Sequence, residues 1–261
     1  MDIQEIFRVI DALAPERNQS AWDNSGVQIA GQVRELDRVA VCLEPTPAMV
    51  GACLDWGAGL VVTHHPLSLE ARPLDEEGPF LEVVRRVLAA RAWLYAAHTS
   101  LDTRPGGPAF WLGAALELRN TAVLEPLAAG DPEPAGFGQI GDLPAPLAWE
   151  AFLARLAGLV GREVLSLAGP APRTVARLAY CNGSGAGLAA RAARAGADVF
   201  VTGDVKYHPA VEAPLCVVDV GHFSLEEEMT RLFAAELDQG LPGVEVRFFA
   251  GREPFRFYRV G

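Results

Sequence analysis

One apolar run that ends in two adjacent histidines constrains this chain more than any other stretch. The run covers Gly59–Thr63 and is followed by His64, His65 and Pro66. An uninterrupted Leu/Val/Thr segment predicts a strand buried on both faces, and proline restricts the residue before it to extended or turn geometry. The sequence therefore predicts that both imidazoles lie at a strand's carboxyl end, the edge at which open α/β sheets bind their ligands.

The histidine pair is compatible with more than one arrangement. Adjacent residues on a strand point to opposite faces, so His64 and His65 serve one site only if the chain turns between them. The alternative is one imidazole for each of two neighbouring metal ions. A pair alone is also compatible with a polar loop that binds nothing, so the other histidines have to be considered.

Alternating strand and helix patterns predict the fold class. The first half is expected to contain helices at 3–13, 47–56, 80–90 and 108–118 and strands at 38–44, 60–63 and 93–97. The second half is expected to contain helices at 149–160, 187–195 and 225–237 and strands at 163–167, 175–181, 198–202, 215–220, 244–249 and 255–259. Strands that alternate with helices imply mostly parallel or mixed sheets with right-handed crossovers. We therefore expect an α/β protein with two similar α/β domains.

The domain boundary is expected in the stretch 121–146, which is rich in Pro, Gly and Ala and is interpreted as the crossing between domains. Within it, Asp131–Pro134 has the composition of a surface turn. The first domain is predicted to cover residues 1–122, with the strands of 244–261 as candidates to return to it. The second is predicted to cover residues 123–243.

Charge and composition exclude several classes of partner. The 261 residues carry a formal net charge of −11 and no basic face interleaved with aromatics, which argues against binding nucleic acid or an acidic membrane surface. Met1–Phe7 carries acids where a signal peptide is basic, and no uncharged run reaches the ~18 apolar residues of a membrane span. We therefore expect a cytoplasmic protein. Its four cysteines lack metal-ligand spacing and are predicted to be reduced thiols, namely Cys42, Cys53, Cys181 and Cys216.

The remaining histidines follow predicted strands in the same way as the first two. His98, His208 and His222 each lie at a predicted strand end or in the loop after it. Because His98 and Asp102 emerge from the strand after the His64-His65 strand, we expect them at the same sheet edge. Five histidines in such positions favour a metal or catalytic site over five structural histidines. Imidazole with carboxylate ligands suits Zn, Fe, Mn or Co.

Two further polar residues, Glu226 and Lys206, are candidates for the same site. Ser224 and Glu227 have capping-box spacing, which places Glu226 in the first turn of the last helix, near His222 and favoured by the helix dipole. Lys206 is the only lysine, so a deprotonatable ammonium is either required there or retained by chance.

Two loops lack a specific signature. The loop Asn182–Gly187 has neither dinucleotide nor Walker spacing, so tight-turn packing is favoured over contact with a substrate anion. The stretch Trp22–Val27 is interpreted as a structural turn rather than the wall of a site.

These residues together resemble a known family. The matching motifs are Trp22-Asp23-Asn24-x-Gly26, Thr63-His64-His65-Pro66, Ala97-His98-Thr99-x-Leu101-Asp102, Gly183-Ser184-Gly185, Thr202-Gly203-Asp204-x-Lys206-Tyr207-His208 and Asp219-x-Gly221-His222-x-x-x-Glu226. In this order they resemble the Nif-three-like dinuclear-metal family, the GTP cyclohydrolase 1 type 2 homologues, over nearly the whole chain. Ser100 and Leu225 depart from the family's pattern without removing a ligand.

The resemblance implies a cofactor and an assembly. It implies two divalent ions per chain in a cleft between two α/β domains, with toroidal hexamers as the usual assembly. The ligands it implies are His64, His65, Asp102, His222 and Glu226. The net charge of −11 opposes casual association, so a hexamer requires a large apolar interface, for which Trp111 and Phe137 are the candidates.

Two classes of function fit this site. The first is a metal-dependent hydrolase, cyclohydrolase-like, that acts on a small and nucleotide-like substrate through an activated water. His98, His208 or Lys206 would then move a proton, and Asp204 would orient one of them. The second is a metal chaperone or store, or a regulatory or interaction protein, which requires no catalytic residue.

Overall fold

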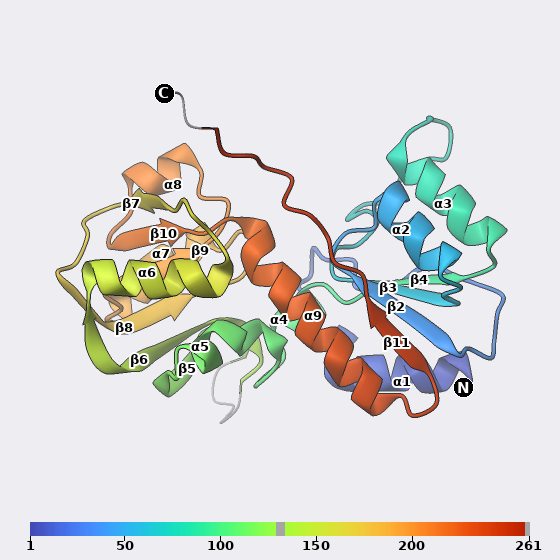
Figure 1. Ribbon diagram of the computed structural model, residues 1–261, viewed down its shortest axis with the longest axis horizontal. Coiled ribbons are helices and arrows are strands. Elements are labelled where there is room, and N and C mark those ends of the chain that lie inside the picture. The colour runs from blue at the N-terminus through green and yellow to red at the C-terminus, as the bar shows by residue number, and fades with distance from the viewer. Residues whose placement is uncertain (129–133, 259–261) are drawn as a thin grey trace. The chain divides into compact units, whose positions relative to one another are not determined.

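The computed structural model describes residues 1–128 and 134–258, and its contacts divide the chain into two compact units. Unit 1 comprises Met1–Pro108 and Met229–Arg252, and unit 2 comprises Ala109–Glu228 and the segment that begins at Glu253. Helix α9 (His222–Gly240) therefore starts in unit 2 and ends in unit 1. Each unit has a mixed sheet with helices, which confirms the predicted α/β class (Figure 1).

The sheet of unit 1 is parallel except at one edge. Its strand order is β1-β4-β3-β2-β11, in which β1 is antiparallel to β4 and the other neighbours are parallel. The strands are β1 (Gly26–Ile29), β2 (Arg38–Cys42), β3 (Leu60–Thr63), β4 (Trp93–Ala96) and β11 (Glu245–Phe248). All four residues of β3 are buried, as its Leu/Val/Thr composition predicts.

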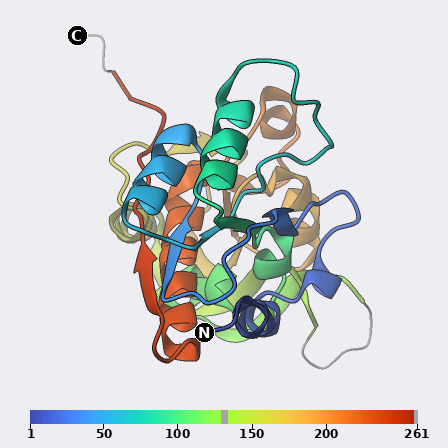
Figure 2. The same cartoon turned by 90° about the vertical axis from the view of Figure 1, so that its right-hand side faces the viewer.

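Helices cover both faces of this sheet. Helices α2 (Pro47–Asp55) and α3 (Pro79–Ala89) lie on one face, and α1 (Ile3–Leu13) lies on the other (Figures 1 and 2). The first face buries a cluster that includes Val50, Cys53, Val83, Val87, Val61 and Leu94. On the second face the ring of Phe7 contacts Trp93 and Tyr95, with ring centroids 5.4 and 5.5 Å apart.

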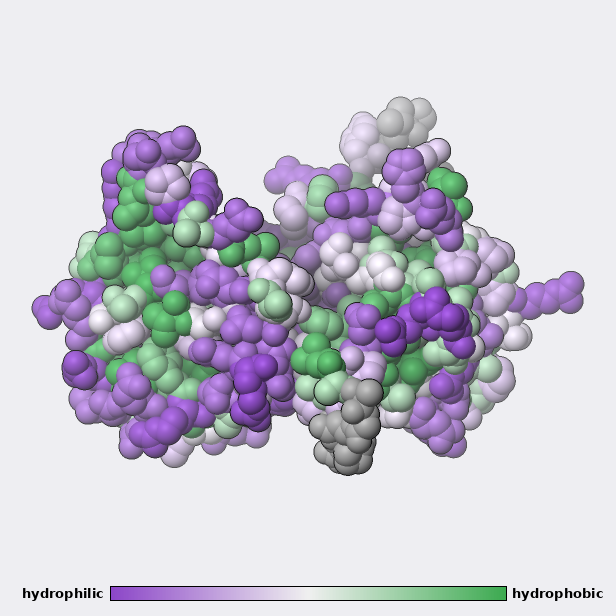
Figure 3. Space-filling view, turned by 180° about the vertical axis from the view of Figure 1, so that it is seen from behind, coloured by the Kyte–Doolittle hydropathy of each residue, from purple (hydrophilic) through white to green (hydrophobic). Residues whose placement is uncertain are grey.

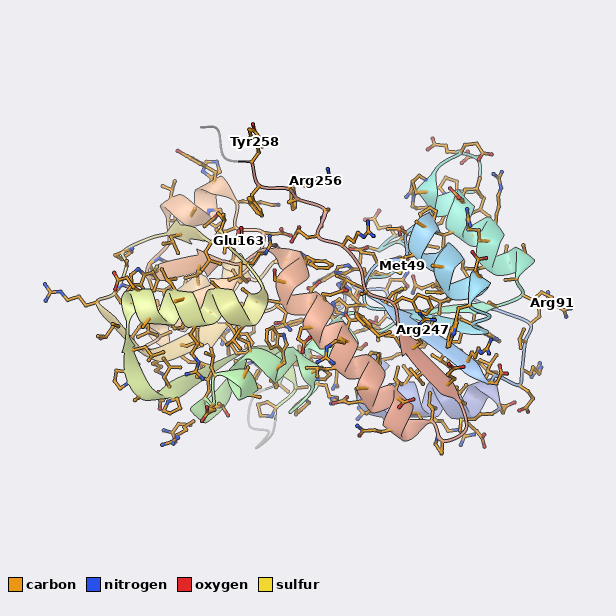
Figure 4. The ribbon with its side chains drawn as sticks, viewed as in Figure 1. Met49, Arg91, Glu163, Arg247, Arg256 and Tyr258 are labelled. Atoms are coloured by element: carbon orange, nitrogen blue, oxygen red, sulfur yellow. The ribbon has the colours of Figure 1, made fainter. Side chains whose placement is uncertain are left out.

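Strand β11 returns from the end of the chain to the edge of this sheet. Its register pairs Glu245 with Arg38, and the two side chains form an ion pair of 3.2 Å. Arg247, labelled beside β11 in Figure 4, places its guanidinium 5.7 Å from the ring of Trp56 and 4.9 Å from that of Phe249. The edge strand is thus held by side chains as well as by its backbone hydrogen bonds.

The sheet of unit 2 is parallel in its centre and antiparallel toward both edges. Its order is β5-β6-β8-β9-β10-β7, with only β8, β9 and β10 parallel. The strands are β5 (Arg119–Pro126), β6 (Gly136–Ala148), β7 (Ser166–Ala168), β8 (Thr174–Tyr180), β9 (Val199–Thr202) and β10 (Cys216–Asp219). Alternate residues of β9 serve different clusters, because Val199 and Val201 face one and Phe200 faces the other.

The helices of unit 2 supply these two clusters. Helix α6 (Trp149–Val160) buries Phe152 and Leu156 in the first cluster, and α7 (Ala189–Arg194) buries Ala189 and Ala192 in the second. The shorter elements are η2 (Pro108–Phe110), α5 (Trp111–Ala115), η3 (Ala186–Leu188) and α8 (Tyr207–Val211).

The predicted domain crossing at 121–146 is wrong, because this stretch contains most of the paired strands β5 and β6. The inward positions of β6 include Gly136 and Gly138, which resemble loop residues in the sequence. A Cβ on Gly136 would lie 2.2 Å from the carbonyl oxygen of Glu125, and one on Gly138 would lie 2.6 Å from that of Tyr180. Close backbone approach therefore explains these glycines. Most of the predicted turn Asp131–Pro134 lies outside the described residues.

The units differ from the predicted domains 1–122 and 123–243. Residues 109–122 group with unit 2, because Leu112 and Leu116 lie in its core and β5 lies in its sheet. Residues 229–243 group with unit 1. No strand follows β11 among the described residues, so the strand expected at 255–259 is not found there.

Two smaller expectations concern cysteine and membrane segments. All four cysteines are free and buried, which confirms the prediction of reduced core thiols. None of the helices among the described residues has the length and apolar composition that crossing a bilayer requires.

The hydroxyl of Tyr180 provides a test of the packing in unit 2. It accepts a hydrogen bond from the N–H of Gly113 and donates one to Oε1 of Gln139, and burial raises the pKa of this tyrosine far above its ordinary value. Tyr180→Phe leaves the buried Gly113 N–H without its acceptor, so we expect a loss of about 1–3 kcal/mol in the free energy of unfolding by urea. Tyr207→Phe, the same change at an exposed position, should leave it unchanged. Equal losses in the two variants would contradict this account.

Candidate metal centre

The two histidines that end the first apolar run lie directly after β3. Their backbone N–H groups donate to the carbonyls of Cys42 and Leu43, so the parallel pairing with β2 continues beyond the strand. The hydroxyl of Thr63 donates to the carbonyl of His65 at 2.6 Å. The rings of His64 and His65 lie 4.9 Å apart with 47° between their planes. The chain therefore turns so that both imidazoles reach one cluster.

A third imidazole joins them from the next strand. His98 follows β4 and is the N-terminal cap of the short helix α4 (Thr99–Asp102). Its ring lies 5.2 Å from that of His64 and 5.5 Å from that of His65. One nitrogen of each ring lies within 4.8 Å of one nitrogen of the other two. The expectation that these residues share a sheet edge is confirmed.

Asp102 completes the polar side chains of this edge. It ends α4, where its N–H donates to the carbonyl of His98. Its Oδ1 lies 3.9 Å from Nε2 of His64, whose side chain is fully buried. A carboxylate thus faces an imidazole in the interior of unit 1.

Each imidazole of unit 1 is oriented through its Nδ1 atom. Nδ1 of His64 lies 2.9 Å from the carbonyl oxygen of Ala97, that of His65 lies 2.6 Å from Oε1 of Glu44, and that of His98 lies 2.6 Å from Oδ1 of Asp23. These oxygens only accept hydrogen bonds, so each Nδ1 carries a proton, and in a neutral ring Nε2 is then the nitrogen with the lone pair. Metal-binding histidines in proteins are oriented in the same way.

Two of these partners, Glu44 and Asp23, are not recognisable as such from the sequence. Glu44 follows β2 at its carboxyl end, a position that the argument about strand ends covers but that a single exposed glutamate does not distinguish. Asp23 lies in the stretch expected to be a structural turn, yet its side chain is fully buried against His98. A buried carboxylate has no signature in one sequence.

Unit 2 contributes a second pair of polar side chains. His222 is the first residue of α9, and its Nε2 lies 2.6 Å from Oε2 of Glu226, one turn later. Its Nδ1 lies 2.7 Å from Oδ2 of Asp204. Asp204 therefore orients His222 itself. Its φ of 54° lies in the left-handed region, which aspartate adopts more often than most residues with a side chain.

The other candidates in unit 2 lie on its surface. Lys206 precedes the short helix α8 and His208 lies on it, and both are exposed. The ring of His208 contacts that of Tyr207, with centroids 5.4 Å apart. Their catalytic roles stay predictions.

Asp219 holds the loops that carry Asp204 and His222. Its two carboxylate oxygens accept hydrogen bonds from the N–H groups of Val205 at 2.9 Å and Gly221 at 2.8 Å. One residue at the end of β10 thus holds both the residue after Asp204 and the residue before His222.

Helix α9 begins earlier than the capping-box spacing predicts. Ser224 and Glu227 lie inside the helix, and the Ser224 hydroxyl accepts a hydrogen bond from Nε of Arg162 at 2.6 Å. The predicted box is therefore wrong. Arg162 is also paired with Glu253.

The contact between Gly183 and Glu226 accounts for a glycine in the loop Asn182–Gly187 of unit 2. Its φ is +59°, and a Cβ there would lie 2.2 Å from Oε1 of Glu226. The loop therefore packs against a candidate ligand, and the missing side chain leaves the room that the Glu226 carboxylate occupies.

The donor atoms suit a divalent ion. The groups found in the two units consist of imidazole nitrogens and carboxylate oxygens, which bind Zn, Fe, Mn or Co, and no cysteine belongs to the cluster of His64, His65 and His98. The described residues thus include histidine and glutamate groups that fit a metal ion.

Comparison with known proteins identifies the family to which this chain belongs. The family model of Duf34/NIF3 (NGG1p interacting factor 3) matches residues 1–254. The chain belongs to the Duf34/NIF3 family. The resemblance seen in the motifs is thereby confirmed over nearly the whole sequence.

Relatives of this Duf34/NIF3 chain occur in several bacteria. A protein of Streptomyces coelicolor named GTP cyclohydrolase 1 type 2 homolog is 32% identical over 247 residues, covering 91% of this chain and 86% of the relative. A protein of Deinococcus radiodurans with the same name is 33% identical over 233 residues, covering 87% and 86%.

Solved structures show the same fold. The structure of a Bacillus cereus protein related to NIF3 matches with a TM-score of 0.89 and 20% identity over 99% of both chains. The structure described as reduced HcgD from Methanocaldococcus jannaschii matches with a TM-score of 0.80 and 24% identity, covering 95% of this chain and 97% of that one.

A substitution at Gly183, which is not itself a proposed ligand, tests the candidate metal centre of this Duf34/NIF3 chain. Gly183→Ala places a methyl group where the Glu226 carboxylate lies and strains a left-handed backbone, so we expect the purified variant to contain less metal than wild type by plasma mass spectrometry. Gly187→Ala is the matched control, because nothing lies within 4 Å of its added Cβ. Wild-type metal content in both variants would show that Glu226 is not a ligand.

Proposed function

We propose that this chain binds two divalent ions and hydrolyses a small molecule with their help. The proposed ligands are His64, His65, Asp102, His222 and Glu226. The observation that carries the proposal is the pair of hydrogen bonds at Nδ1 of His64 and His65, the orientation that metal-binding histidines have in proteins.

The chemistry divides between the ions and the chain. A bound divalent ion lowers the pKa of a coordinated water and polarises a substrate oxygen. His98 supplies a proton acceptor at Nε2, because Asp23 already holds its Nδ1 proton. Glu44 and Asp204 orient the rings of the proposed ligands His65 and His222 through hydrogen bonds at Nδ1.

The proposed substrate class comes from the names of the relatives. Those proteins are named GTP cyclohydrolase 1 type 2 homolog, so hydrolytic opening of a purine nucleotide ring is the first reaction to test. Phosphoesters and cyclic amides extend the screen, since the same chemistry hydrolyses them.

A screen with metal-loaded protein separates this function from metal storage. We expect hydrolysis of one substrate class by wild type and a rate at least ~100-fold lower in His98→Gln, which removes the proton acceptor. Metal content measured on the same samples should be unchanged in that variant. Metal-loaded protein without activity toward any substrate class would favour the metal chaperone or store instead.

Three consecutive glutamates provide an internal control for the ligand assignment. Glu226 is nearly fully buried beside His222, whereas Glu227 and Glu228 line a different hollow of about 770 Å³ together with Arg162 and Phe257. Successive helical positions differ by about 100° in direction, which accounts for this difference.

Substitution by Gln removes one charge and little volume at each of these positions. We expect Glu226→Gln to lose at least one ion per chain, measured by plasma mass spectrometry. Glu227→Gln and Glu228→Gln should keep the wild-type metal content. Equal loss in all three would refute the assignment.

We also propose that the protein forms a homo-oligomer, with a hexamer as the expected size. The expected interface residues require correction, because Trp111 and Phe137 are half-buried and pack on the core of unit 2. Hydrophobic side chains do reach the surface elsewhere, as the face in Figure 3 illustrates. The exposed aromatic residues are Trp22, Tyr207, Phe255, Phe257 and Tyr258.

Light scattering measures this assembly directly. We expect a hexamer at micromolar concentration. Association of a chain with net charge −11 requires the burial of apolar surface whose stabilisation outweighs the charge repulsion. A monomer at that concentration would contradict the proposal.

A further inference from the structure

The turn before β1 is built around one histidine. Trp22 contacts the ring of His98, with centroids 5.8 Å apart and 75° between the planes. The Ser25 hydroxyl accepts a hydrogen bond from the His98 N–H at 3.2 Å and donates one to Asp23 at 2.8 Å. Trp22, Asp23 and Ser25 thus all contact His98, more than seventy positions away. A purely local turn does not require such contacts.

Asp23 is the centre of this arrangement. Its side chain has no exposed surface, yet both carboxylate oxygens are satisfied. Oδ1 accepts from the N–H of Asn24 at 2.7 Å and from Nδ1 of His98 at 2.6 Å. Oδ2 accepts from the Ser25 hydroxyl at 2.8 Å, and from the N–H and hydroxyl of Thr99 at 3.0 and 2.5 Å.

The hydrogen bonds keep this buried carboxylate ionised. Burial alone raises the pKa of Asp23, but the hydrogen bonds from His98, Thr99 and Ser25 outweigh that effect and hold the pKa well below its usual range. An ionised carboxylate only accepts hydrogen bonds, so the neutral His98 ring must carry its proton on Nδ1.

We propose that Asp23 is a positioning residue that fixes His98 as the Nδ1–H tautomer and so keeps Nε2 free of a proton within the cluster of His64, His65 and His98. The use of that nitrogen as a proton acceptor rests on the proposed function. The tautomer itself does not, because it follows from the contacts of Asp23 alone.

The Asp23→Asn variant distinguishes a positioning role of Asp23 from simple packing. Three hydrogen-bond donors converge on Oδ2, so the single amide oxygen of Asn occupies that position. The amide nitrogen then takes the place of Oδ1 and donates to Nδ1 of His98. Because Nδ1 must now accept, the His98 proton moves to Nε2.

The ring nitrogens report this change directly in metal-free protein. Two-bond ¹H–¹⁵N spectra of histidine-labelled protein, with His98 identified by its absence in His98→Gln, should show a protonated Nδ1 and an unprotonated Nε2 in wild type. In Asp23→Asn the two nitrogens should exchange these states. Glu44→Gln, which alters the carboxylate at His65 only, should leave the His98 signals unchanged.

The wild-type spectrum decides the proposal even if Asp23→Asn does not fold. A protonated Nε2 on wild-type His98, or signals averaged between the two tautomers, overturns it. Unchanged His98 signals in a folded Asp23→Asn variant also overturn it.

Turnover provides the second measurement. With a substrate found by the hydrolase screen, we expect Asp23→Asn to lower kcat at least ~10-fold at unchanged metal content, and an unchanged kcat despite an exchanged tautomer would overturn the positioning role. Absence of turnover in wild type would contradict the proposed function and leave the tautomer result to stand alone.

Discussion

The candidate metal centre depends on one kind of hydrogen bond, from an imidazole Nδ1 to an oxygen that can only accept. Such a bond settles which ring nitrogen carries the proton and fixes the ring plane at the same time. Four histidines among the described residues have it: His64 with Ala97, His65 with Glu44, His98 with Asp23 and His222 with Asp204. Without these partners each ring would rotate and exchange tautomers, and the spacing of the nitrogens would not persist.

The first sheet could be predicted from the sequence because its central strands are apolar and short. Leu60–Thr63 and Trp93–Ala96 are almost entirely buried, so composition alone identifies them as parallel strands. The position of the histidines then follows from topology, since parallel strands end at a common edge. What remained open was their orientation, because alternation of side chains applies within a strand, and both His64 and His65 lie beyond it.

The features that the sequence did not reveal depend on residues distant along the chain. Strands β5 and β6 looked like a linker, because glycine in β6 avoids collision with the backbone of partners that the sequence does not identify. Asp23 looked like a turn residue, because its principal partner lies 75 residues away. The spacing of Ser224 and Glu227 suggested a helix start, but Arg162 binds the serine hydroxyl inside the helix. Local patterns are ambiguous wherever a tertiary contact determines the conformation.

The two units repeat one local arrangement, although their sheets differ in order. In unit 1 a histidine begins a helix and a carboxylate follows four residues later, at His98 and Asp102. In unit 2 His222 and Glu226 have the same spacing at the start of α9. Each histidine follows a strand of the parallel part of its sheet and has a second carboxylate on Nδ1. In α9 the spacing of four brings both side chains to one face of the helix, while the strand end fixes where that helix begins. A histidine followed by a carboxylate in this way requires only a parallel strand, a helix start and one distant carboxylate, which explains how two different sheets arrive at the same arrangement.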